Sequence, residues 1–278
     1  MTESVVDYYS ETAIDYLTWS QGYNMHFGYW RWGLNPFCRE SMLEEMNLQV
    51  ASVFTSVKGL VLDLGCGMGA TMRSMAHRCP DKRILGFTIV PEQQKTASRL
   101  NLEFGTRLRV ERASYIQLPL EDGFADGAYA LESACYAPGQ NKEQFARELH
   151  RVLKPGAPFC VADGFAKTSP SSQPSLFRKL LEWSGEGWAV QQYGNLPAFI
   201  QALKETGFRE VKVREVSWNV GPTALQSPFV VMKYLWRKLK QGEKLSSIQW
   251  RHLRACLVAP LVGLFFPHFG YFVITGYR

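Results

Sequence analysis

The sequence predicts an α/β protein built on a doubly wound, mostly parallel β-sheet. Short apolar runs of strand length alternate along the chain with stretches of helical periodicity, which is the pattern of parallel βαβ units. The first apolar run, Leu60 to Leu64, passes into a loop with glycine at every second position, and a helical pattern follows. A strand, a glycine-rich loop and a helix in this order allow a ligand to approach bare backbone.

The N-terminal 58 residues predict a helical, aromatic-rich cap in front of the sheet. Val5, Tyr8 and Thr12 recur at helical spacing, and an amphipathic pattern resumes from Ser41 to Phe54. Between these stretches, aromatic residues are denser than is usual outside a core or a ligand pocket. We therefore divide the chain into a cap over residues 1–58 and a sheet domain over residues 59–278.

Strands and helices then alternate through the sheet domain. Pro91 favours the first turn of a helix, and Lys154-Pro155-Gly156 stops the helix before the fifth strand. A long, mostly helical insertion over residues 225–268 is expected before the last strand. Seven strands are expected, at residues 60–64, 83–89, 108–111, 126–131, 158–163, 207–216 and 271–276.

Composition and cysteine usage predict a globular protein of the cytoplasm. Hydrophobic residues make up 46% and charged residues 20% of the chain, which is ordinary for a globular protein. Asp7, Glu11 and Asp15 interrupt any signal-peptide pattern at the start. The six cysteines lack metal-binding spacing, so we expect buried thiols in a reducing compartment and no metal site.

Positive charge is concentrated in the last quarter of the sequence. Residues 209–278 contain 11 Lys/Arg and 3 Asp/Glu, a balance of +8, whereas the rest carries 20 and 22, a balance of −2. A solvated helix face is the simplest interpretation, and peripheral contact with an anionic membrane surface or a diphosphate is the functional one. Nucleic acid is not expected, because no recognised binding motif accompanies the charge. A membrane span over residues 257–274 is not expected, because Pro260 and Pro267 interrupt it.

The first strand and its loop place Asp63, Gly65, Gly67 and Gly69 in an order that resembles motif I of the class I S-adenosylmethionine-dependent methyltransferases. The resemblance extends from about Asp7 to Asp163 and is weaker beyond. It implies a Rossmann-like methyltransferase fold with S-adenosylmethionine as cofactor. Backbone at Gly65 and Gly67 would hold the amino acid end of the cofactor. Asp63 would orient the loop or reach the cofactor's amino group through water, and capping of the loop amides is its structural alternative.

The second strand leads into residues 86–93, which read Gly-Phe-Thr-Ile-Val-Pro-Glu-Gln. This resembles the G-I-T-L-S-P-x-Q stretch of a narrower branch, the sterol, tocopherol and cyclopropane-forming methyltransferases. There a Thr and a Gln replace the acid that binds the ribose hydroxyls, which implies this role for Thr88 and Gln93. A hydroxyl and an amide can each bond a diol without charge. Alternatively, Thr88 is only a strand residue and Gln93 a surface residue of the next helix.

The position after the third strand is where the family usually carries an acid for the adenine amino group. Aligned on Leu118-Pro119, that position falls on Ser114, beside Tyr115. A serine hydroxyl can accept the same hydrogen bond, although more weakly than a carboxylate. The resemblance therefore implies that Ser114 and Tyr115 contact the adenine.

The fourth strand ends in residues 129–138, YALESACYAP, which are similar to the E-A-T-x-H-A-P segment of sterol C-methyltransferases. This segment is expected at the carboxyl edge of the sheet, where doubly wound folds bind ligands. The aromatic-rich stretch YNMHFGYW, residues 23–30, resembles N-terminal segments of the same branch. The resemblance implies a hydrophobic substrate bound by Tyr23, Phe27, Tyr29, Trp30 and Tyr136.

These residue types fit methylation of an alkene carbon. Attack on a sulfonium methyl leaves a carbocation on the substrate, which aromatic faces stabilise by about 2 kcal/mol per desolvated contact. A base must then remove one proton. Glu132 is the first candidate for this base, and His26 is the second.

We therefore interpret the chain as a class I methyltransferase that C-methylates a hydrophobic terpenoid or sterol alkene. O-methylation or aromatic C-methylation of a lipophilic natural product is one alternative, and non-catalytic lipid binding on the same fold is another. A prenyl diphosphate substrate is a variant of the first interpretation and would bring Mg²⁺. The sequence determines neither the exact substrate nor the oligomeric state.

Overall fold

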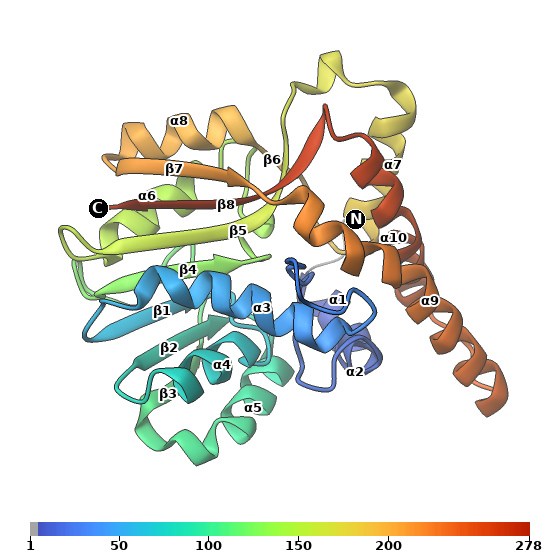
Figure 1. Ribbon diagram of the computed structural model, residues 1–278, viewed down its shortest axis with the longest axis horizontal. Coiled ribbons are helices and arrows are strands. Elements are labelled where there is room, and N and C mark those ends of the chain that lie inside the picture. Colours follow the sequence, from blue (N-terminus) through green and yellow to red (C-terminus); the bar gives the residue numbers. More distant parts are fainter. Residues whose placement is uncertain (1–4) are drawn as a thin grey trace.

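The computed structural model describes residues 5–278 and confirms the doubly wound α/β class. The strand order is β3-β2-β1-β4-β5-β8-β7, with a short strand, β6, paired to β5. Strands β1 to β5 pair in parallel, and β8 runs antiparallel between β5 and β7 (Figure 1). The bounds are Leu60–Leu64 (β1), Arg83–Thr88 (β2), Leu108–Arg112 (β3), Gly127–Leu131 (β4), Pro158–Ala166 (β5), Gly194–Asn195 (β6), Arg209–Glu215 (β7) and Phe269–Tyr277 (β8). All seven predicted strands are present, and β6 is an addition.

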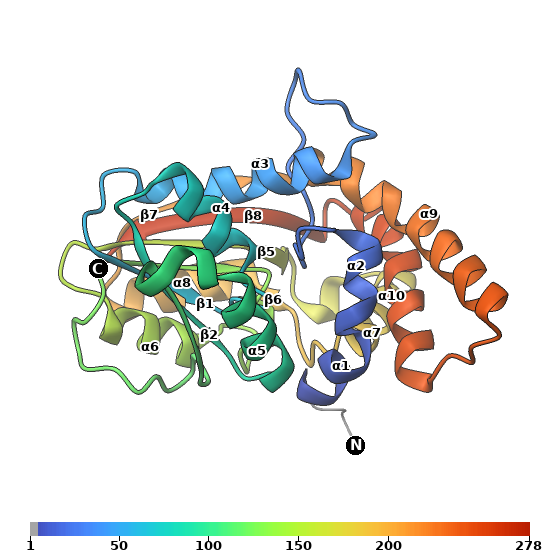
Figure 2. The ribbon, with the colours of Figure 1, turned by 90° about the horizontal axis from the view of Figure 1, so that it is seen from below.

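Helices cover both faces of the sheet. One layer consists of α3 (Arg39–Ala51), α4 (Ala70–Arg78) and α5 (Pro91–Leu100), and the other contains α6 (Glu143–Val152) and α8 (Leu196–Thr206). Figure 2 shows α3 and α4 on one side of the sheet and α6 on the other. Two separate core clusters fill the space between the layers and the sheet.

Strand β1 contributes to both clusters because its side chains alternate between the two faces. Val61 packs with Met46 and Met72 under the first helix layer. Leu62 packs with Phe145 under the second layer. Because both faces of this strand are buried, its sequence is an almost continuous apolar run. Such a run predicts a central strand of a parallel sheet.

The remaining helices gather at the carboxyl end of the parallel strands (Figure 1). They are α1 (Val5–Thr12), α2 (Tyr16–Trp19), α7 (Ser175–Gly187), α9 (Ser217–Gln241) and α10 (Ser247–Leu264). Helices α7 and α10 share a small apolar cluster of their own, separate from the main core. This arrangement encloses the edge of the sheet at which doubly wound folds bind ligands.

The helical insertion begins at Ser217, ahead of the predicted residue 225. Pro222 and Pro228 lie inside α9 and Pro260 lies inside α10, and none of them ends its helix. Buried side chains of α9 and α10 pack against each other, and this packing offsets the hydrogen bonds that the prolines remove. Within residues 5–278, no helix is long and apolar enough to cross a membrane. The division of the chain at residue 59 stays a prediction.

Candidate active site

The loop after β1 runs through three glycines whose backbones all lie in the left-handed region. Their φ angles are 94° at Gly65, 50° at Gly67 and 75° at Gly69. A Cβ at Gly65 would lie 2.4 Å from the Cβ of Ser133, and one at Gly67 would lie 3.2 Å from Met25 Sδ. Both conformation and space therefore require glycine here. The loop passes directly into α4, whose N-cap is Gly69.

Asp63 is buried within β1, two residues before the first of these glycines. Its Oδ2 accepts a hydrogen bond of 2.8 Å from the Tyr129 hydroxyl on the neighbouring strand β4. Burial raises the pKa of the Asp63 carboxyl to about 7, and the Tyr129 hydrogen bond opposes this shift. The carboxyl thus links the two strands where the glycine loop begins.

Thr88 and Gln93 are joined to each other across the start of α5. The Thr88 hydroxyl donates to Gln93 Oε1 at 2.7 Å and accepts from the Val90 N–H at 3.2 Å. Gln93 is buried, so the alternative that it is a surface residue is wrong. Its Nε2 faces Met25 Sδ at 3.8 Å, and a thioether is a weak acceptor. A buried amide with only this partner among the described residues has donor capacity left for a ligand.

Met25, in the N-terminal segment, contacts both Gln93 and the glycine loop. Its sulfur lies against Gln93 and against the position of a Gly67 Cβ. The N-terminal segment therefore covers the glycine loop. Met25 was missed in the sequence, where its aromatic neighbours carry the stronger signal.

Ser114 and Tyr115 differ in their position relative to the loop. Ser114 is exposed, and its hydroxyl accepts a local hydrogen bond of 3.3 Å from the Ile116 N–H. The Tyr115 ring lies 3.7 Å from the position of a Gly65 Cβ, and its hydroxyl donates to the Ser133 carbonyl at 2.6 Å. The structure therefore places Tyr115, and not the Ser114 side chain, beside the glycine loop.

His26 is buried in a polar network that uses both ring nitrogens. Nδ1 bonds the Phe27 carbonyl at 2.8 Å, and Nε2 lies 3.1 Å from Asn24 Oδ1 and 3.0 Å from Asn47 Oδ1. Burial lowers the pKa of the imidazole. Asn47 also accepts from the Thr71 hydroxyl on α4, at 2.8 Å. His26 thus connects the N-terminal segment to α3 and α4, and no ring nitrogen remains for a substrate.

Glu132 follows β4 directly and has a backbone conformation that is unusual for a residue with a side chain, with φ of 48°. Its Oε1 accepts hydrogen bonds from the Phe27 N–H at 2.7 Å and from the Tyr271 hydroxyl at 2.9 Å. Its Oε2 accepts no hydrogen bond from the part of the chain that the structure describes. The next residue, Ser133, contacts Gly65. One carboxylate oxygen of Glu132 is therefore available, and the residue that follows Glu132 borders the glycine loop.

The surroundings of Glu132 favour its protonated form. Burial raises the pKa of this carboxyl to about 8, and the Phe27 N–H opposes the shift. The nearby Asp163 carboxyl raises the pKa further, whereas the Tyr271 hydroxyl lowers it. A carboxyl that titrates close to neutral pH is well matched to proton transfer.

Asp163 on β5 was missed in the sequence. Its carboxyl accepts hydrogen bonds from the Cys135 N–H at 2.9 Å and the Gly164 N–H at 2.8 Å. Burial raises the pKa of this carboxyl to about 6. Its place near the end of the fifth predicted strand, next to the strand of Glu132, is the signal that could have identified it.

Aromatic side chains from several segments form a cluster near Glu132. The Phe27 ring lies edge-on to Trp19 at 5.8 Å and to Trp188 at 6.1 Å, between ring centroids. The Tyr136 hydroxyl lies 2.9 Å from the Tyr9 hydroxyl and donates to the Trp188 carbonyl at 3.0 Å. Phe27 and Tyr136 were predicted from the sequence, whereas Tyr9 and Trp188 were missed because only the fold brings them close.

The other predicted aromatic residues lie away from this cluster. The Tyr29 hydroxyl accepts from Arg214 Nη1 at 3.0 Å on β7, and Trp30 Nε1 donates to the Leu34 carbonyl at 2.9 Å. Tyr23 lies in a turn with φ of 64° and bonds the Ser20 carbonyl through its N–H. Tyr29 nevertheless packs against the same core cluster as Phe27, and all these residues are half-buried, so aromatic density in the sequence did not show which partners each side chain would take.

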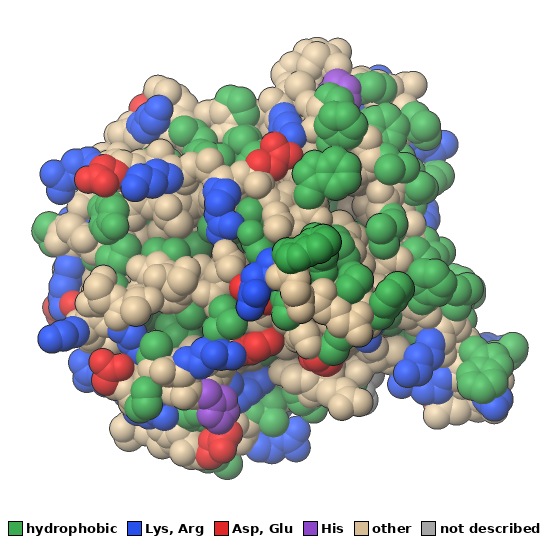
Figure 3. All heavy atoms as spheres, in the orientation of Figure 1, with side chains coloured by type: hydrophobic (Ala, Val, Ile, Leu, Met, Phe, Trp, Pro, Cys, Tyr) green, Lys and Arg blue, Asp and Glu red, His purple; other side chains and the backbone are tan. Residues whose placement is uncertain are grey.

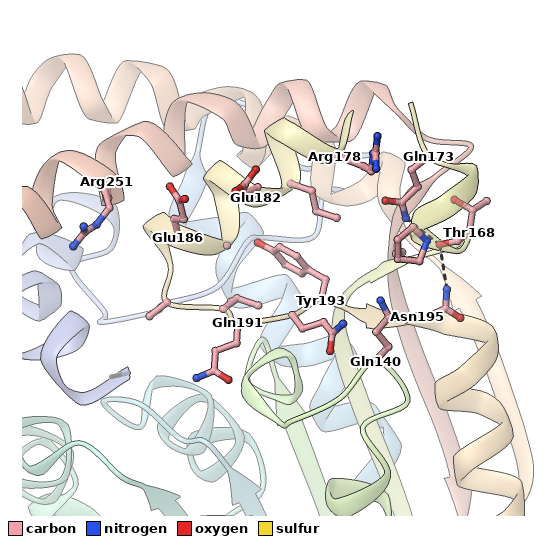
Figure 4. A pocket seen from close by; sticks show the side chains of 17 residues that line it. Gln140, Thr168, Gln173, Arg178, Glu182, Glu186, Gln191, Tyr193, Asn195 and Arg251 are labelled. Atoms are coloured by element: carbon pink, nitrogen blue, oxygen red, sulfur yellow. Dashed lines mark hydrogen bonds between the residues drawn. The ribbon is translucent and has the colours of Figure 1, made fainter. Parts of the chain in front are cut away.

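A cavity of about 630 Å³ lies at the same edge of the sheet (Figure 4). It is bounded by α7, the loop after β5 and the segment before β6, and its volume is typical of small-molecule sites. Tyr193 lines it, and the Tyr193 hydroxyl lies 2.6 Å from Ser184 Oγ. Burial raises the pKa of Tyr193, and the nearby Asp163 and Glu132 carboxyls add to this shift. Tyr193 thus stands between the cavity that it lines and the region of these two carboxyls.

Lys142 holds the loop that follows Glu132. Its ammonium is buried and donates to three backbone carbonyls, of Cys135 at 2.9 Å, Ala137 at 2.7 Å and Gln192 at 2.6 Å. Burial lowers the pKa of this lysine, and the nearby Cys135 and Asp163 groups oppose the shift. One side chain thus fixes the loop after β4 to the segment that lines the cavity.

Replacement of this lysine is expected to destabilise the protein. Lys142→Met leaves three carbonyls without their buried donor, and we expect the free energy of unfolding to fall by about 3 kcal/mol in urea titration. Lys154→Met is the matched control, because Lys154 is half exposed and bonds Asp126 at the surface, where a loss below about 1 kcal/mol is expected. Equal effects of the two changes would contradict this role.

Comparison with known proteins agrees with the fold and the glycine loop. Residues 61–156 match a family model described as a methyltransferase domain. The chain is 26% identical over 261 residues to 24-methylenesterol C-methyltransferase 2 of Arabidopsis thaliana, covering 93% of this chain and 67% of that protein. It is 30% identical over 209 residues to an O-methyltransferase of Pyrenophora dematioidea, covering 71% of this chain and 73% of that protein. A solved structure of geranyl diphosphate C-methyltransferase from Streptomyces coelicolor A3(2), with Mg²⁺, geranyl diphosphate and S-adenosyl-L-homocysteine, superposes with a TM-score of 0.68 at 15% identity, covering 93% of each chain.

A doubly wound sheet with a glycine loop after its first strand is an arrangement that binds nucleoside-containing cofactors at the carboxyl edge of the sheet. The chain belongs to the class I S-adenosylmethionine-dependent methyltransferases. It is an enzyme, and its cofactor is S-adenosylmethionine.

Proposed function

We propose that this methyltransferase transfers the methyl group to an alkene carbon of a hydrophobic terpenoid or sterol. The observation that carries the proposal is the placement of Glu132, which precedes the residue that borders the glycine loop and whose carboxyl bonds Phe27 of the aromatic cluster with one oxygen and leaves the other available. An alkene is uncharged and needs no base for its attack, but the cation that it becomes needs both stabilisation and a proton acceptor.

S-adenosylmethionine supplies an electrophilic methyl group when it is bound. The π electrons of the substrate form the new carbon–carbon bond, the carbon–sulfur bond breaks, and positive charge remains on the substrate. Faces of Phe27, Tyr9 and Trp188 stabilise that charge by about 2 kcal/mol for each desolvated contact. Oε2 of Glu132 then accepts the proton from a neighbouring carbon, whose C–H electrons form the product alkene.

Tyr271 and Phe27 position this base. Their hydrogen bonds to Oε1 fix the carboxyl and leave Oε2 directed elsewhere. His26, the second candidate, has both ring nitrogens in hydrogen bonds within the N-terminal segment and α3. We therefore assign proton acceptance to Glu132 and a positioning role to His26.

The cofactor is held by backbone and by neutral side chains in this proposal. Gly65 and Gly67 receive its amino acid end, Thr88 and Gln93 bond its ribose hydroxyls, and Tyr115 flanks its base. The buried Gln93 amide, which has only a weak sulfur partner, supports this assignment. Met25 must then move from Gln93 or pack on the bound cofactor.

Gln93→Ala is expected to weaken cofactor affinity by about 1 kcal/mol in calorimetry, as for one lost hydrogen bond. Gln94→Ala is the matched control, because its neighbouring amide bonds the Val110 carbonyl at 3.4 Å and not the cofactor region. If Gln93→Ala changes only substrate affinity, the assignment of the ribose site is wrong.

The cavity beyond Tyr193 is the route by which we expect the substrate to approach. The test of the function is incubation of the enzyme with methyl-labelled cofactor and a panel of sterols, linear terpenes, prenyl diphosphates and phenols. Label is expected in products of the alkene substrates. Turnover confined to phenols would overturn the proposal.

O-methylation is the second candidate, because one relative at 30% identity is an O-methyltransferase. For that reaction a base must lie near a hydroxyl, and Glu132 could serve there as well. A prenyl diphosphate substrate would need a cation for its phosphates. Among the residues that the structure describes, no group of three or more His, Cys, Asp and Glu side chains could hold a metal, so that variant would take its cation with the substrate.

A further inference from the structure

Helix α9 has a buried inner face and an exposed outer face on opposite sides. The inner face mixes apolar with hydroxyl side chains and packs against the cap and α10, whereas the outer face is entirely apolar and yet exposed. Both sets recur at intervals of three to four residues, and they lie about half a turn apart. The inner set is Val220, Thr223, Ser227, Val231 and Tyr234. The outer set, which we call the α9 stripe, is Leu225, Phe229, Met232, Trp236 and Leu239.

The exposure of the stripe is large for such side chains. Phe229 is 67%, Trp236 60% and Leu239 79% exposed. Single exposed apolar residues are common on proteins, whereas a contiguous row along one helix marks an interaction surface. In Figure 3, hydrophobic side chains accompany the projecting end of the molecule where Figure 1 places α9.

The charged side chains of α9 itself are all positive. The helix carries Lys233, Arg237, Lys238 and Lys240, and its sequence contains no Asp or Glu. Lys238 forms an ion pair with Glu243 just after the helix, so the charge offered beside the stripe comes from Lys233, Arg237 and Lys240. The Lys240 ammonium lies 3.7 Å from the centre of the Trp236 ring. Figure 3 shows lysine and arginine side chains beside hydrophobic ones at the projecting end.

We propose that the α9 stripe docks on an anionic phospholipid surface. An exposed apolar face with an aromatic residue and basic flanks has the composition of helices that lie in the plane of a membrane interface. The basic residues add electrostatic attraction to acidic headgroups. A second copy of the chain fits less well, because pairing two such stripes would bring like charges together.

This geometry needs no span of the bilayer, because only the outer face of the helix enters the interface. The inner face stays packed on α10 through Val231, Tyr234 and Leu253. The proposal thus uses only the part of the positive surplus that lies on α9, four of the eleven Lys/Arg of residues 209–278. It does not depend on which substrate the enzyme methylates.

The test is co-sedimentation of the full-length protein with vesicles. Vesicles of neutral phosphatidylcholine are compared with vesicles that also contain phosphatidylglycerol, at low and high salt. Binding is expected only to the anionic vesicles, and it should weaken as salt screens the lysines. Trp236→Ser with Leu239→Ser should weaken binding at least tenfold, because both side chains lose their buried area in the interface.

The matched control is Leu102→Ser with Phe124→Ser, which removes two exposed apolar side chains far from α9 in the sequence. It should bind as the wild type does. Absence of wild-type binding at low salt, or equal losses in both double variants, would overturn the proposal. A wild-type dimer in light scattering that Trp236→Ser with Leu239→Ser dissociates would overturn it too, because the stripe would then be an interface between copies.

Discussion

Glu132→Gln is expected to lower turnover about 100-fold or more while cofactor affinity stays near that of the wild type. The amide keeps the size of the carboxyl and can still accept from the Phe27 N–H and the Tyr271 hydroxyl. It cannot accept a proton near neutral pH, and loss of a general base costs roughly 100-fold or more in rate. Calorimetry for the cofactor and steady-state turnover separate the two properties.

The pH dependence provides an independent check of the same residue. Only ionised Glu132 can accept the proton, and its pKa is raised to about 8, so kcat should rise with pH and level off above that value. Tyr271→Phe removes a hydrogen bond that favours the ionised form, and the rise should move to higher pH. A profile that is flat from about pH 6 to 9 would contradict the role of Glu132.

The stability of the wild type should fall with pH over the range in which its activity rises. Because the folded-state pKa of Glu132 lies above that of an unfolded chain, the folded state binds more protons and the wild type loses stability as pH rises toward 8. Glu132→Gln removes this loss. Relative to the wild type, the melting temperature of the variant should therefore rise with pH. A variant that loses stability at every pH together with activity would assign Glu132 to a structural role.

Gly67→Val is expected to abolish cofactor binding. Its backbone has φ of 50°, and a Cβ would point toward Met25 at 3.2 Å, into the region assigned to the amino acid end of the cofactor. Gly242→Val is the matched control, because Gly242 has φ of 67° and no atom within 4 Å of its Cβ position. Both changes impose about 1 to 2 kcal/mol of left-handed strain. In calorimetry, only Gly67→Val should lose cofactor binding. Unchanged cofactor affinity in a folded Gly67→Val variant would contradict the assignment of this loop to the cofactor.

The sheet could be predicted because its information is local. Each central strand is a short apolar run. The glycines that follow β1 indicate left-handed backbone and close approach of another group to the main chain. Glu132 could be identified from the sequence for the same reason, because it directly follows a recognisable strand. Its partners Phe27 and Tyr271 were not, because both contacts span more than a hundred residues of sequence.

The partners of the aromatic side chains in the N-terminal segment could not be predicted from the sequence. The sequence identifies Tyr29 and Trp30 as aromatic, but only the tertiary structure shows that Tyr29 turns toward Arg214 and Trp30 toward its own loop. Prolines indicate breaks in helices, yet α9 continues through Pro228 because its inner face is packed on α10. The outer face of α9 has the same composition as a buried face, so its exposure could not be read from the sequence.

The most direct test of the proposed reaction is the bond that the transferred methyl group forms. The enzyme is incubated with cofactor that carries ¹³C in its methyl group and with an accepted alkene substrate, and the product is examined by carbon NMR. We predict a signal in the range of methyl groups bound to carbon, together with loss of one substrate hydrogen in mass spectrometry. A signal in the range of methyl groups bound to oxygen would contradict the account.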